Sequence, residues 1–370
     1  MAGRIVLFGA TGYTGELTAR ELAGRGERPV LAARNEARVR ALADELGGLE
    51  WALADVGGAG GTASVRALVE RGDVLLSTVG PFARWGAPAV EAAIDAGAHY
   101  VDSTGETPFI RDVFERYGPR AAAAGSALLT AMGYDWVPGN LAGALALRDA
   151  GPEAVRVRIG YFLTGGGGAG SMSGGTRASA AGVMLEPSFA WRGGRLVTER
   201  GGARGRSFAL DGSARKGLSV GSTEHFGLPA AFPGLREVDV YLGWFGGATD
   251  AVRAFALGAS LLGKVPGVRP ALNELVARTV RGSSGGPDAD ARAASGATVV
   301  AEAQDAGGRT LASARLEGVN GYDFTAGMLA WSAHAAATGR VHGVGALGPV
   351  EAFGLDALVE GSRSAGIERV

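Results

Sequence analysis

The sequence predicts an α/β protein with a doubly wound parallel sheet and a second α+β domain. The first observation is that short apolar segments alternate with segments of helical spacing through the first 140 residues. The apolar segments lie at 5–8, 29–33, 50–54, 74–79, 99–101 and 127–131, and the helical ones at 14–24, 36–46, 63–70, 87–96 and 110–124. Strands joined by helices of this length form right-handed βαβ units. Their continuous apolar character is expected when helices cover both faces of the sheet.

The second observation is a change of pattern after about residue 150. Strands are predicted at 154–163, 207–210, 238–244, 297–303 and 310–317, and helices at 177–185, 248–262, 270–280, 325–339 and 355–365. A chain of 370 residues is long enough for two domains. We therefore predict one domain over 1–150 and an α+β domain over 151–349 that serves substrate binding or dimerisation. A C-terminal helix within 350–370 is expected to pack back on the first domain.

Composition excludes several kinds of chemistry. The chain has no cysteine, which removes disulfides, thiol nucleophiles and zinc–thiolate sites. No two of its four histidines have metal-ligand spacing, so no metal site is predicted. The formal net charge of −1 gives no field that would attract nucleic acid. No stretch reads as a leader or a membrane span, and we expect a cytoplasmic protein.

The strongest local motif is glycine-rich and lies between the first predicted strand and helix. It consists of Gly9, Ala10, Thr11, Gly12, Tyr13, Thr14 and Gly15. Glycines at such a turn let the backbone approach a pyrophosphate, and the helix N-terminus offers N–H groups to it. The alternative is a turn without a ligand. Because the βα alternation continues beyond it, we favour a dinucleotide-binding, Rossmann-type domain.

The end of the second strand indicates which dinucleotide binds. An NAD site usually has an acidic residue there for the ribose 2′-hydroxyl. This chain has Arg34 and Asn35 instead, with Arg38 one helical turn later. Arginine suits a 2′-phosphate, although Arg34 could also be a surface residue at a helix start. We predict NADP, bound as NADPH, rather than NAD.

Further candidate cofactor contacts follow the third and fourth strands. Asp55 lies where such folds place the adenine, but it could equally cap a helix. Thr78, Val79, Gly80 and Pro81 end the fourth strand, where the chain passes under the ribose and nicotinamide. A Gly-Pro pair also simply ends strands.

Three residues are candidates for catalysis. Tyr134 follows the sixth strand and could donate a proton or hold an oxyanion, with Asp135 to orient it. Both could instead be structural, Tyr134 by packing and Asp135 by capping. His225, beside Glu224, is a candidate proton donor, although an isolated histidine is often structural. No tyrosine has a lysine four residues later, which excludes the Tyr–Lys catalysis of short-chain dehydrogenases.

Taken together, these motifs resemble the saccharopine dehydrogenase-like reductases, and most closely their trans-acting enoyl reductase branch. The resemblance rests on segments 9–15, 31–35, 77–82, 99–106, 133–141, 173–176, 224–229, 240–246 and 346–361. It implies a Rossmann domain that binds NADP, a mixed-sheet second domain, a homodimer, and hydride transfer to a C=C or C=N bond. One departure is Trp136, where relatives commonly have serine, and this predicts a reshaped pocket.

We expect an NADPH-dependent oxidoreductase that reduces an activated double bond, such as an α,β-unsaturated carbonyl. Its substrate would be a small molecule of lipid, polyketide or other secondary metabolism, free or carrier-bound. The few cations of the predicted pocket, mainly Arg84 and Arg177, favour a less polar substrate. A glycine-rich segment at 164–175 could act as a lid. The alternatives are an imine reductase of the saccharopine-reductase type and a non-catalytic NADP(H) sensor.

Overall fold

The computed structural model describes residues 3–57, 61–165, 187–262 and 285–370. Its contacts divide the chain into two units, which are described separately. The first unit contains Met1–Gly105, Phe109–Val137 and Gly321–Ile367. The second contains Glu106–Pro108, Pro138–Asn320 and Glu368–Val370.

A seven-stranded parallel sheet forms the centre of the first unit. Its order is β15-β6-β5-β4-β1-β2-β3, so the chain winds outward in both directions from β1. The strands are β1 Ile5–Phe8, β2 Val30–Ala33, β3 Trp51–Leu53, β4 Val74–Ser77, β5 His99–Asp102, β6 Ala127–Leu129 and β15 Gly345–Ala346. The predicted doubly wound fold is confirmed, and all six predicted strands are present.

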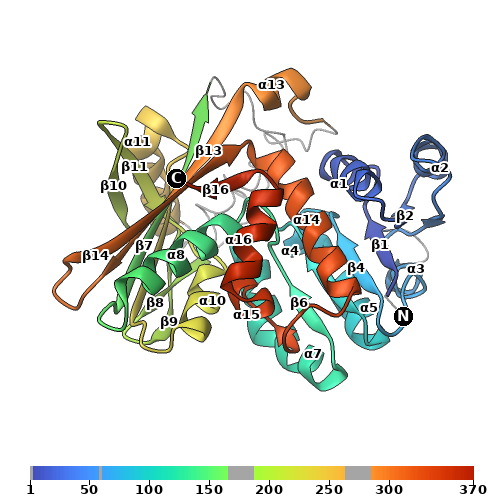
Figure 1. The fold of residues 1–370 in the computed structure, drawn as a ribbon, viewed down its shortest axis with the longest axis horizontal. Helices are drawn as coiled ribbons and strands as arrows, with labels where there is room; N and C mark the ends of the chain where they lie inside the picture. The colour runs from blue at the N-terminus through green and yellow to red at the C-terminus, as the bar shows by residue number, and fades with distance from the viewer. Residues whose placement is uncertain (1–2, 58–60, 166–186, 263–284) are drawn as a thin grey trace. The chain divides into compact units, whose positions relative to one another are not determined.

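Helices cover both faces of this sheet (Figure 1). They are α1 Tyr13–Gly24, α2 Glu36–Glu45, α3 Gly61–Arg66, α4 Phe82–Trp85, α5 Ala87–Ala96, α7 Gly118–Ala124, α14 Gly321–Ala337, α15 Pro349–Phe353 and α16 Leu355–Ser364. The helix predicted over 110–124 is instead three segments: α6 Thr107–Asp112, a π-helical turn at Val113–Tyr117, and α7. Gly118-Pro119 explains the break, because proline cannot continue an α-helical hydrogen-bond ladder.

Helix α14 packs against α1 and against strands β1, β4 and β5. The chain therefore returns to the first unit at Gly321, before the predicted boundary at 349. The other boundary also differs from the predicted 150, because most of α8 (Val137–Ala150) belongs to the second unit. Both differences have one cause: helical spacing shows which face of a helix is apolar but not which sheet that face covers.

The second unit is built on a mixed nine-stranded sheet. Its main path is β10-β11-β12-β7-β13-β14-β16, and the β8–β9 hairpin joins it through β12. Its strands are β7 Arg156–Gly165, β8 Pro187–Arg192, β9 Arg195–Arg200, β10 Gly205–Leu210, β11 Ser213–Ser219, β12 Glu237–Leu242, β13 Ser295–Gln304, β14 Thr310–Val319 and β16 Ile367–Arg369. Among the residues that the structure describes, its α-helices are α8, α10 Glu224–Ala231, α11 Thr249–Leu262 and α13 Ala289–Ala293. This confirms the predicted α+β second domain, although β8, β9, β11 and β16 were not predicted.

The two faces of this second sheet differ in chemistry. On one face α8 and α10 pack closely, since a Cβ placed on Gly143 would lie 2.7 Å from Leu228 and 3.1 Å from Ile159. The other face carries an apolar cluster of Phe162, Phe208, Leu210 and Tyr241, together with a charged network.

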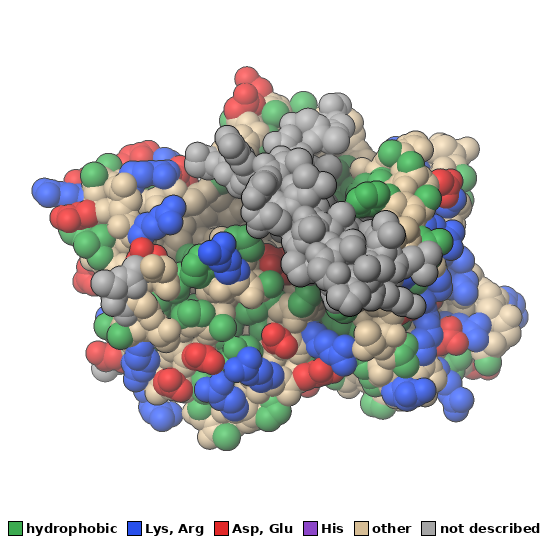
Figure 2. Space-filling view, turned by 180° about the vertical axis from the view of Figure 1, so that it is seen from behind, with side chains coloured by type: hydrophobic (Ala, Val, Ile, Leu, Met, Phe, Trp, Pro, Cys, Tyr) green, Lys and Arg blue, Asp and Glu red, His purple; other side chains and the backbone are tan. Residues whose placement is uncertain are grey.

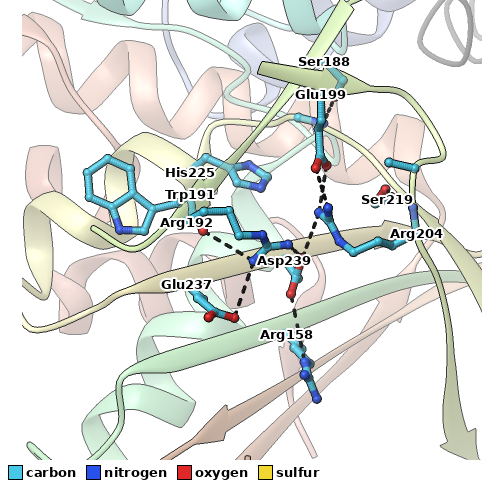
Figure 3. A network of polar contacts seen from close by, with 12 residues as sticks. Arg158, Ser188, Trp191, Arg192, Glu199, Arg204, Ser219, His225, Glu237 and Asp239 are labelled. Carbon is cyan, nitrogen blue, oxygen red and sulfur yellow. Dashed lines mark hydrogen bonds and ion pairs between the residues drawn. The ribbon is translucent and has the colours of Figure 1, made fainter. Parts of the chain in front are cut away.

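Asp239 on β12 is the centre of that network (Figure 3). Its side chain is only 7% exposed. It forms ion pairs with Arg192, with Arg204 at 3.0 Å and with Arg158 at 4.0 Å. Burial opposes ionisation of Asp239, but hydrogen bonding and attraction from Arg192, with Arg204, hold its pKa below the usual range. Arg192 lies on β8 and Arg204 precedes β10, so this one carboxylate joins three parts of the sheet.

Some predicted features lie outside the described residues. These are the helices at 177–185 and 270–280, most of the glycine-rich segment at 164–175, and Arg177. Within the described ranges, no helix has the length and apolar character needed to cross a bilayer.

We predict that Asp239→Asn lowers the free energy of unfolding by about 2 to 4 kcal/mol. The substitution removes the buried charge that Arg192 and Arg204 share, and leaves each arginine with only its second partner, Glu237 or Glu199. Because the carboxylate's pKa is lowered in the folded state, its stabilisation is present above about pH 4 and is lost as the pH falls further. Urea unfolding between pH 3 and 8 measures both effects. Asp250→Asn is the control, since Asp250 pairs with Lys216 but is 73% exposed and should change stability by under about 0.5 kcal/mol. Equal effects of the two substitutions would contradict the role given to Asp239.

Candidate functional site

The glycine-rich turn lies at the edge of the first sheet where the parallel strands end. Gly9 has φ +93°, and a Cβ there would lie 2.7 Å from Thr78 Oγ1. A Cβ on Gly15 would overlap the Gly9 carbonyl oxygen. Two positions of this turn therefore accept only glycine, which brings the backbone of α1 against β1.

Helix α1 begins directly after this turn, with Gly12 as its N-cap. No side chain caps the helix, so its N-terminal N–H groups are not satisfied by a capping residue. The turn itself is fixed by backbone hydrogen bonds from Gly9 to Ala32 (2.8 Å) and from Gly12 to Gly9 (3.0 Å). Thr11, Tyr13 and Thr14 lie in this segment, and the Tyr13 ring meets Tyr322 edge-on at 5.2 Å. The arrangement fits an anion such as a pyrophosphate at the helix N-terminus.

Arg34 and Asn35 follow β2 at the same edge. Within the described part of the chain, the exposed Arg34 has no hydrogen-bond or ion-pair partner. Asn35 caps α2 by accepting the N–H of Arg38 at 3.0 Å. Arg38 donates to the Thr11 carbonyl at 2.7 Å and pairs with Glu16 at 3.0 Å. Arg38 therefore supports the turn, while Arg34 is the cation available for a 2′-phosphate.

The residues after β3 and β4 also have structural partners. Thr78 donates to the carbonyl oxygens of Phe8 (3.3 Å) or Gly9 (3.2 Å), which ties β4 to the glycine turn. Val79 packs beneath Gly9, and Gly80 and Pro81 lead into α4. Asp55 accepts the Gly57 N–H at 2.9 Å. All five lie at the same edge of the sheet, but none makes a contact that by itself identifies a ligand.

Asp102, at the end of β5, organises the neighbouring strand. It accepts hydrogen bonds from Thr104 N (2.9 Å), Ala131 N (2.8 Å) and Thr130 Oγ1 (2.8 Å). Complete burial raises the pKa of Asp102 to about 6, although each of these hydrogen bonds favours the charged form and lowers the pKa. Ala131 has φ +60°, which is unfavourable for a side chain with a Cβ. Asp102 thus holds a strained turn that leads directly into Gly133, Tyr134 and Asp135.

Tyr134 is buried, and its main-chain N–H donates to Thr325 Oγ1 at 3.0 Å. Its ring lies against Gly321, where a Cβ would be 3.0 Å from Tyr134 Cδ1. Burial, with a contribution from Asp135, raises the pKa of the Tyr134 hydroxyl above its usual value. Tyr134 therefore keeps its proton at neutral pH and can act only as a hydrogen-bond donor or acceptor. The neighbouring Trp136 is also buried, at 1% exposure.

Asp135 has an unusual environment for a carboxyl group. A Cβ on Gly105 would lie 2.6 Å from Asp135 Oδ2, so the carboxyl lies against the backbone that follows β5. Its Oδ1 is buried and has no hydrogen-bond partner among the described residues. Burial raises the pKa of Asp135 to about 7. The group can therefore hold or release a proton near neutral pH.

His225 belongs to the second unit, and its environment favours a structural role. The ring is 1% exposed, Nδ1 accepts the Ser222 N–H at 3.2 Å, and Phe189 meets it edge-on at 5.5 Å. Burial lowers the pKa of His225 to about 4, so the ring is neutral at pH 7 and is not an imidazolium acid. His225 has no part in the function proposed below.

The sequence analysis did not identify Ala131 or Thr325 as parts of this site. Gly105 and Asp102 belong to a segment that it singled out only as a group. A left-handed alanine has no signature in a single sequence. Thr325 lies 191 residues from Tyr134, and no local pattern connects the two.

Charged groups of both signs are interspersed over the face shown in Figure 2. This agrees with the formal net charge of −1. The preference of the site for an anion is therefore local, and it comes from the uncapped α1 and Arg34.

Comparisons with known proteins agree with this geometry. Residues 5–129 match the family model described as the saccharopine dehydrogenase NADP binding domain. A trans-acting enoyl reductase of Mycobacterium ulcerans (strain Agy99) is 42% identical over 141 residues, which is 37% of this chain and 34% of that protein. The enzyme of the same name from Mycobacterium tuberculosis (strain ATCC 25618 / H37Rv) is 40% identical over 141 residues, with the same coverage. The match thus spans about a third of these curated relatives.

Solved structures extend the likeness in fold to the whole chain. Saccharopine dehydrogenase (L-Glu forming) from Saccharomyces cerevisiae has a TM-score of 0.60 at 16% identity and covers 100% of both chains. Homospermidine synthase from Legionella pneumophila, in complex with NAD, has a TM-score of 0.62 at 9% identity and covers 100% of this chain and 92% of its own. The fit of the glycine turn and Arg34, taken with the family match, leads to one conclusion. Residues 5–129 are similar to the saccharopine dehydrogenase NADP binding domain, and the cofactor of this domain is NADP.

Proposed function

We propose that the protein is an NADPH-dependent reductase of an activated carbon–carbon double bond, such as an α,β-unsaturated carbonyl in a lipid, polyketide or other secondary metabolite. The observation that carries the proposal is Asp135, a carboxyl that can exchange a proton near pH 7 at the edge of an NADP-binding sheet. The enoyl reductase name of the curated relatives supports the choice of a C=C bond.

In this proposal the first unit binds the coenzyme through three features. The uncapped N-terminus of α1 takes the pyrophosphate, and the close approach at Gly9 and Gly15 makes room for it. Arg34, which has no partner among the described residues, binds the 2′-phosphate at the position where NAD sites have an acidic residue.

The chemistry needs one hydride and one proton. When bound, the reduced nicotinamide supplies the hydride to the β-carbon of the unsaturated carbonyl. Asp135 then gives its proton to the α-carbon. Its Oδ1 is available for that transfer because it has no hydrogen-bond partner among the described residues. Tyr134 is the candidate donor to the enolate oxygen, since burial keeps its hydroxyl protonated.

A panel of acceptors tests the function directly. NADPH oxidation with enoyl thioesters, and none with cyclic imines, is the expected result. Turnover of imines alone would favour the imine reductase, whose C=N nitrogen would take the same proton. If the protein binds NADPH tightly but no acceptor oxidises it, the result would favour a non-catalytic NADP(H) sensor.

Arg34→Ala tests the 2′-phosphate contact. Loss of the guanidinium should raise the Kd for NADPH by about tenfold or more and leave the weaker binding of NADH within about twofold. Calorimetry with both coenzymes measures the difference. Arg40→Ala serves as a control, since Arg40 is another exposed arginine but lies on α2. Equal losses for NADPH and NADH would refute the assignment.

Gly15→Ala tests the close approach of α1 to β1. The added methyl overlaps a carbonyl oxygen of the turn, so the turn must open and NADPH affinity should fall by at least about tenfold. Gly24→Ala is the matched control on the same helix, because a Cβ there meets nothing within 4 Å. Unchanged NADPH binding by the Gly15 variant would show that the turn is not the coenzyme site.

Asp135→Asn tests the proton donor. Because the protonated carboxyl is the active form, wild-type kcat should decline as the pH rises through about 7. The variant should lose kcat by about 100-fold and lose this limb of the profile, with NADPH affinity unchanged. Asp112→Asn, at an exposed aspartate of α6, controls for charge removal. If the variant keeps wild-type turnover at all pH values, Asp135 is not the donor.

A further inference from the structure

We propose that Thr325, in the first turn of α14, is a positioning residue that fixes the segment from Gly133 to Asp135 for reduction. The inference rests on the proposed function, because the group that Thr325 orients is the proposed proton donor. Neither the family match, which ends at residue 129, nor the sequence pattern assigns a role to this residue.

The hydroxyl of Thr325 makes two hydrogen bonds, one as donor and one as acceptor, which together fix its orientation. It donates its single hydrogen to the Gly321 carbonyl at 2.6 Å, and it accepts the main-chain N–H of Tyr134 at 3.0 Å. The Tyr134 N–H belongs to the peptide unit that joins Gly133 to Tyr134, one unit before the peptide bond to Asp135. Thr325 therefore anchors the backbone one residue from the carboxyl that must be aimed.

Packing on both sides of this bond restricts the segment further. A Cβ on Gly133 would lie 2.8 Å from Thr325 Cγ2 and 2.9 Å from its hydroxyl oxygen, so the two backbones approach as closely as glycine allows. The ring of Tyr134 lies against Gly321 in the same turn of α14. From the other side, the Asp135 carboxyl is stopped by Gly105. The donor is thus bracketed between the end of β5 and the start of α14.

The same helical turn also reaches the coenzyme turn. Tyr322, three residues before Thr325, contacts the ring of Tyr13 between Gly12 and Gly15. One turn of α14 therefore spans the distance between the dinucleotide-binding turn and the donor segment within the first unit. The hydrogen bond between Tyr134 and Thr325 would therefore align the proton donor with the coenzyme turn, in addition to stabilising the fold.

Thr325→Val, Thr325→Ser and Thr338→Val separate positioning from stability. Valine keeps the shape of threonine but removes both hydrogen bonds, whereas serine keeps the hydroxyl. Thr338, just beyond the end of α14, is the matched control: its hydroxyl donates to the His334 carbonyl at 2.7 Å, four residues back, as that of Thr325 does to Gly321. Thr338 is exposed and accepts nothing from the 133–135 segment. Thr325→Ala replaces the valine variant if that protein fails to fold.

We expect Thr325→Val to lower kcat by about tenfold through misalignment of the donor, with the NADPH Kd and the substrate KM within about twofold of wild type. Its kcat–pH profile should fall at a lower pH than that of the wild type, because a released Asp135 reaches water and its pKa returns toward the usual value. Thr325→Ser should retain near-wild-type kcat, and Thr338→Val should change none of these quantities.

A second readout does not need turnover. The pH dependence of the stability difference between each protein and its Asp135→Asn derivative reports the folded-state pKa of Asp135. In the Thr325→Val background that pKa should be lower than in the wild type. If the wild type reduces no acceptor, the proposed function fails while this measurement still decides the positioning claim. An Asp135 pKa and a kcat profile that match those of Thr338→Val would overturn it, as would a serine variant as impaired as the valine variant.

Discussion

The coenzyme site depends on a steric constraint at the first turn of the chain. Gly9 and Gly15 leave no space for a Cβ, so α1 starts in direct contact with the end of β1. Thr78 ties β4 to the same turn, and Arg38 holds its Thr11 carbonyl from the start of α2. Four elements therefore meet at one backbone loop. The α1 N–H groups and Arg34 lie at this loop, where they can contact an anion.

The buried carboxylates of the chain serve different purposes according to their partners. Asp239 is surrounded by arginines and remains charged, which joins three parts of the second sheet. Asp102 accepts three hydrogen bonds and fixes the strained Ala131. Asp135 has no partner for one oxygen in the described chain, and this is the arrangement in which a carboxyl is available for proton transfer. The environment, and not the residue type, separates structural from reactive groups.

The order of strands and helices in the first unit could be predicted from the sequence because apolar runs and glycine turns are local signals. The glycine turn, Arg34 and the segment at 133–135 were found in the same way. What could not be predicted is long-range: that α14 covers the first sheet, that Thr325 bonds to Tyr134, and that β8 and β9 join β12. The second sheet has one charged face, so its strands lack the uniform apolar pattern of buried parallel strands. His225 looked reactive beside Glu224, and only its burial reveals a neutral ring.

Because Gly321–Ile367 completes a unit that starts at the N-terminus, the second unit interrupts the first in the chain. On a ribosome, strands β1 to β6 of the parallel sheet emerge long before α14, the helix that packs against β1, β4 and β5. The apolar surface of these strands therefore stays uncovered until the chain has been synthesised as far as α14. A fragment that ends after the nucleotide-binding region would lack α14 and would leave this apolar surface exposed to water. We expect such a fragment to aggregate rather than to fold independently.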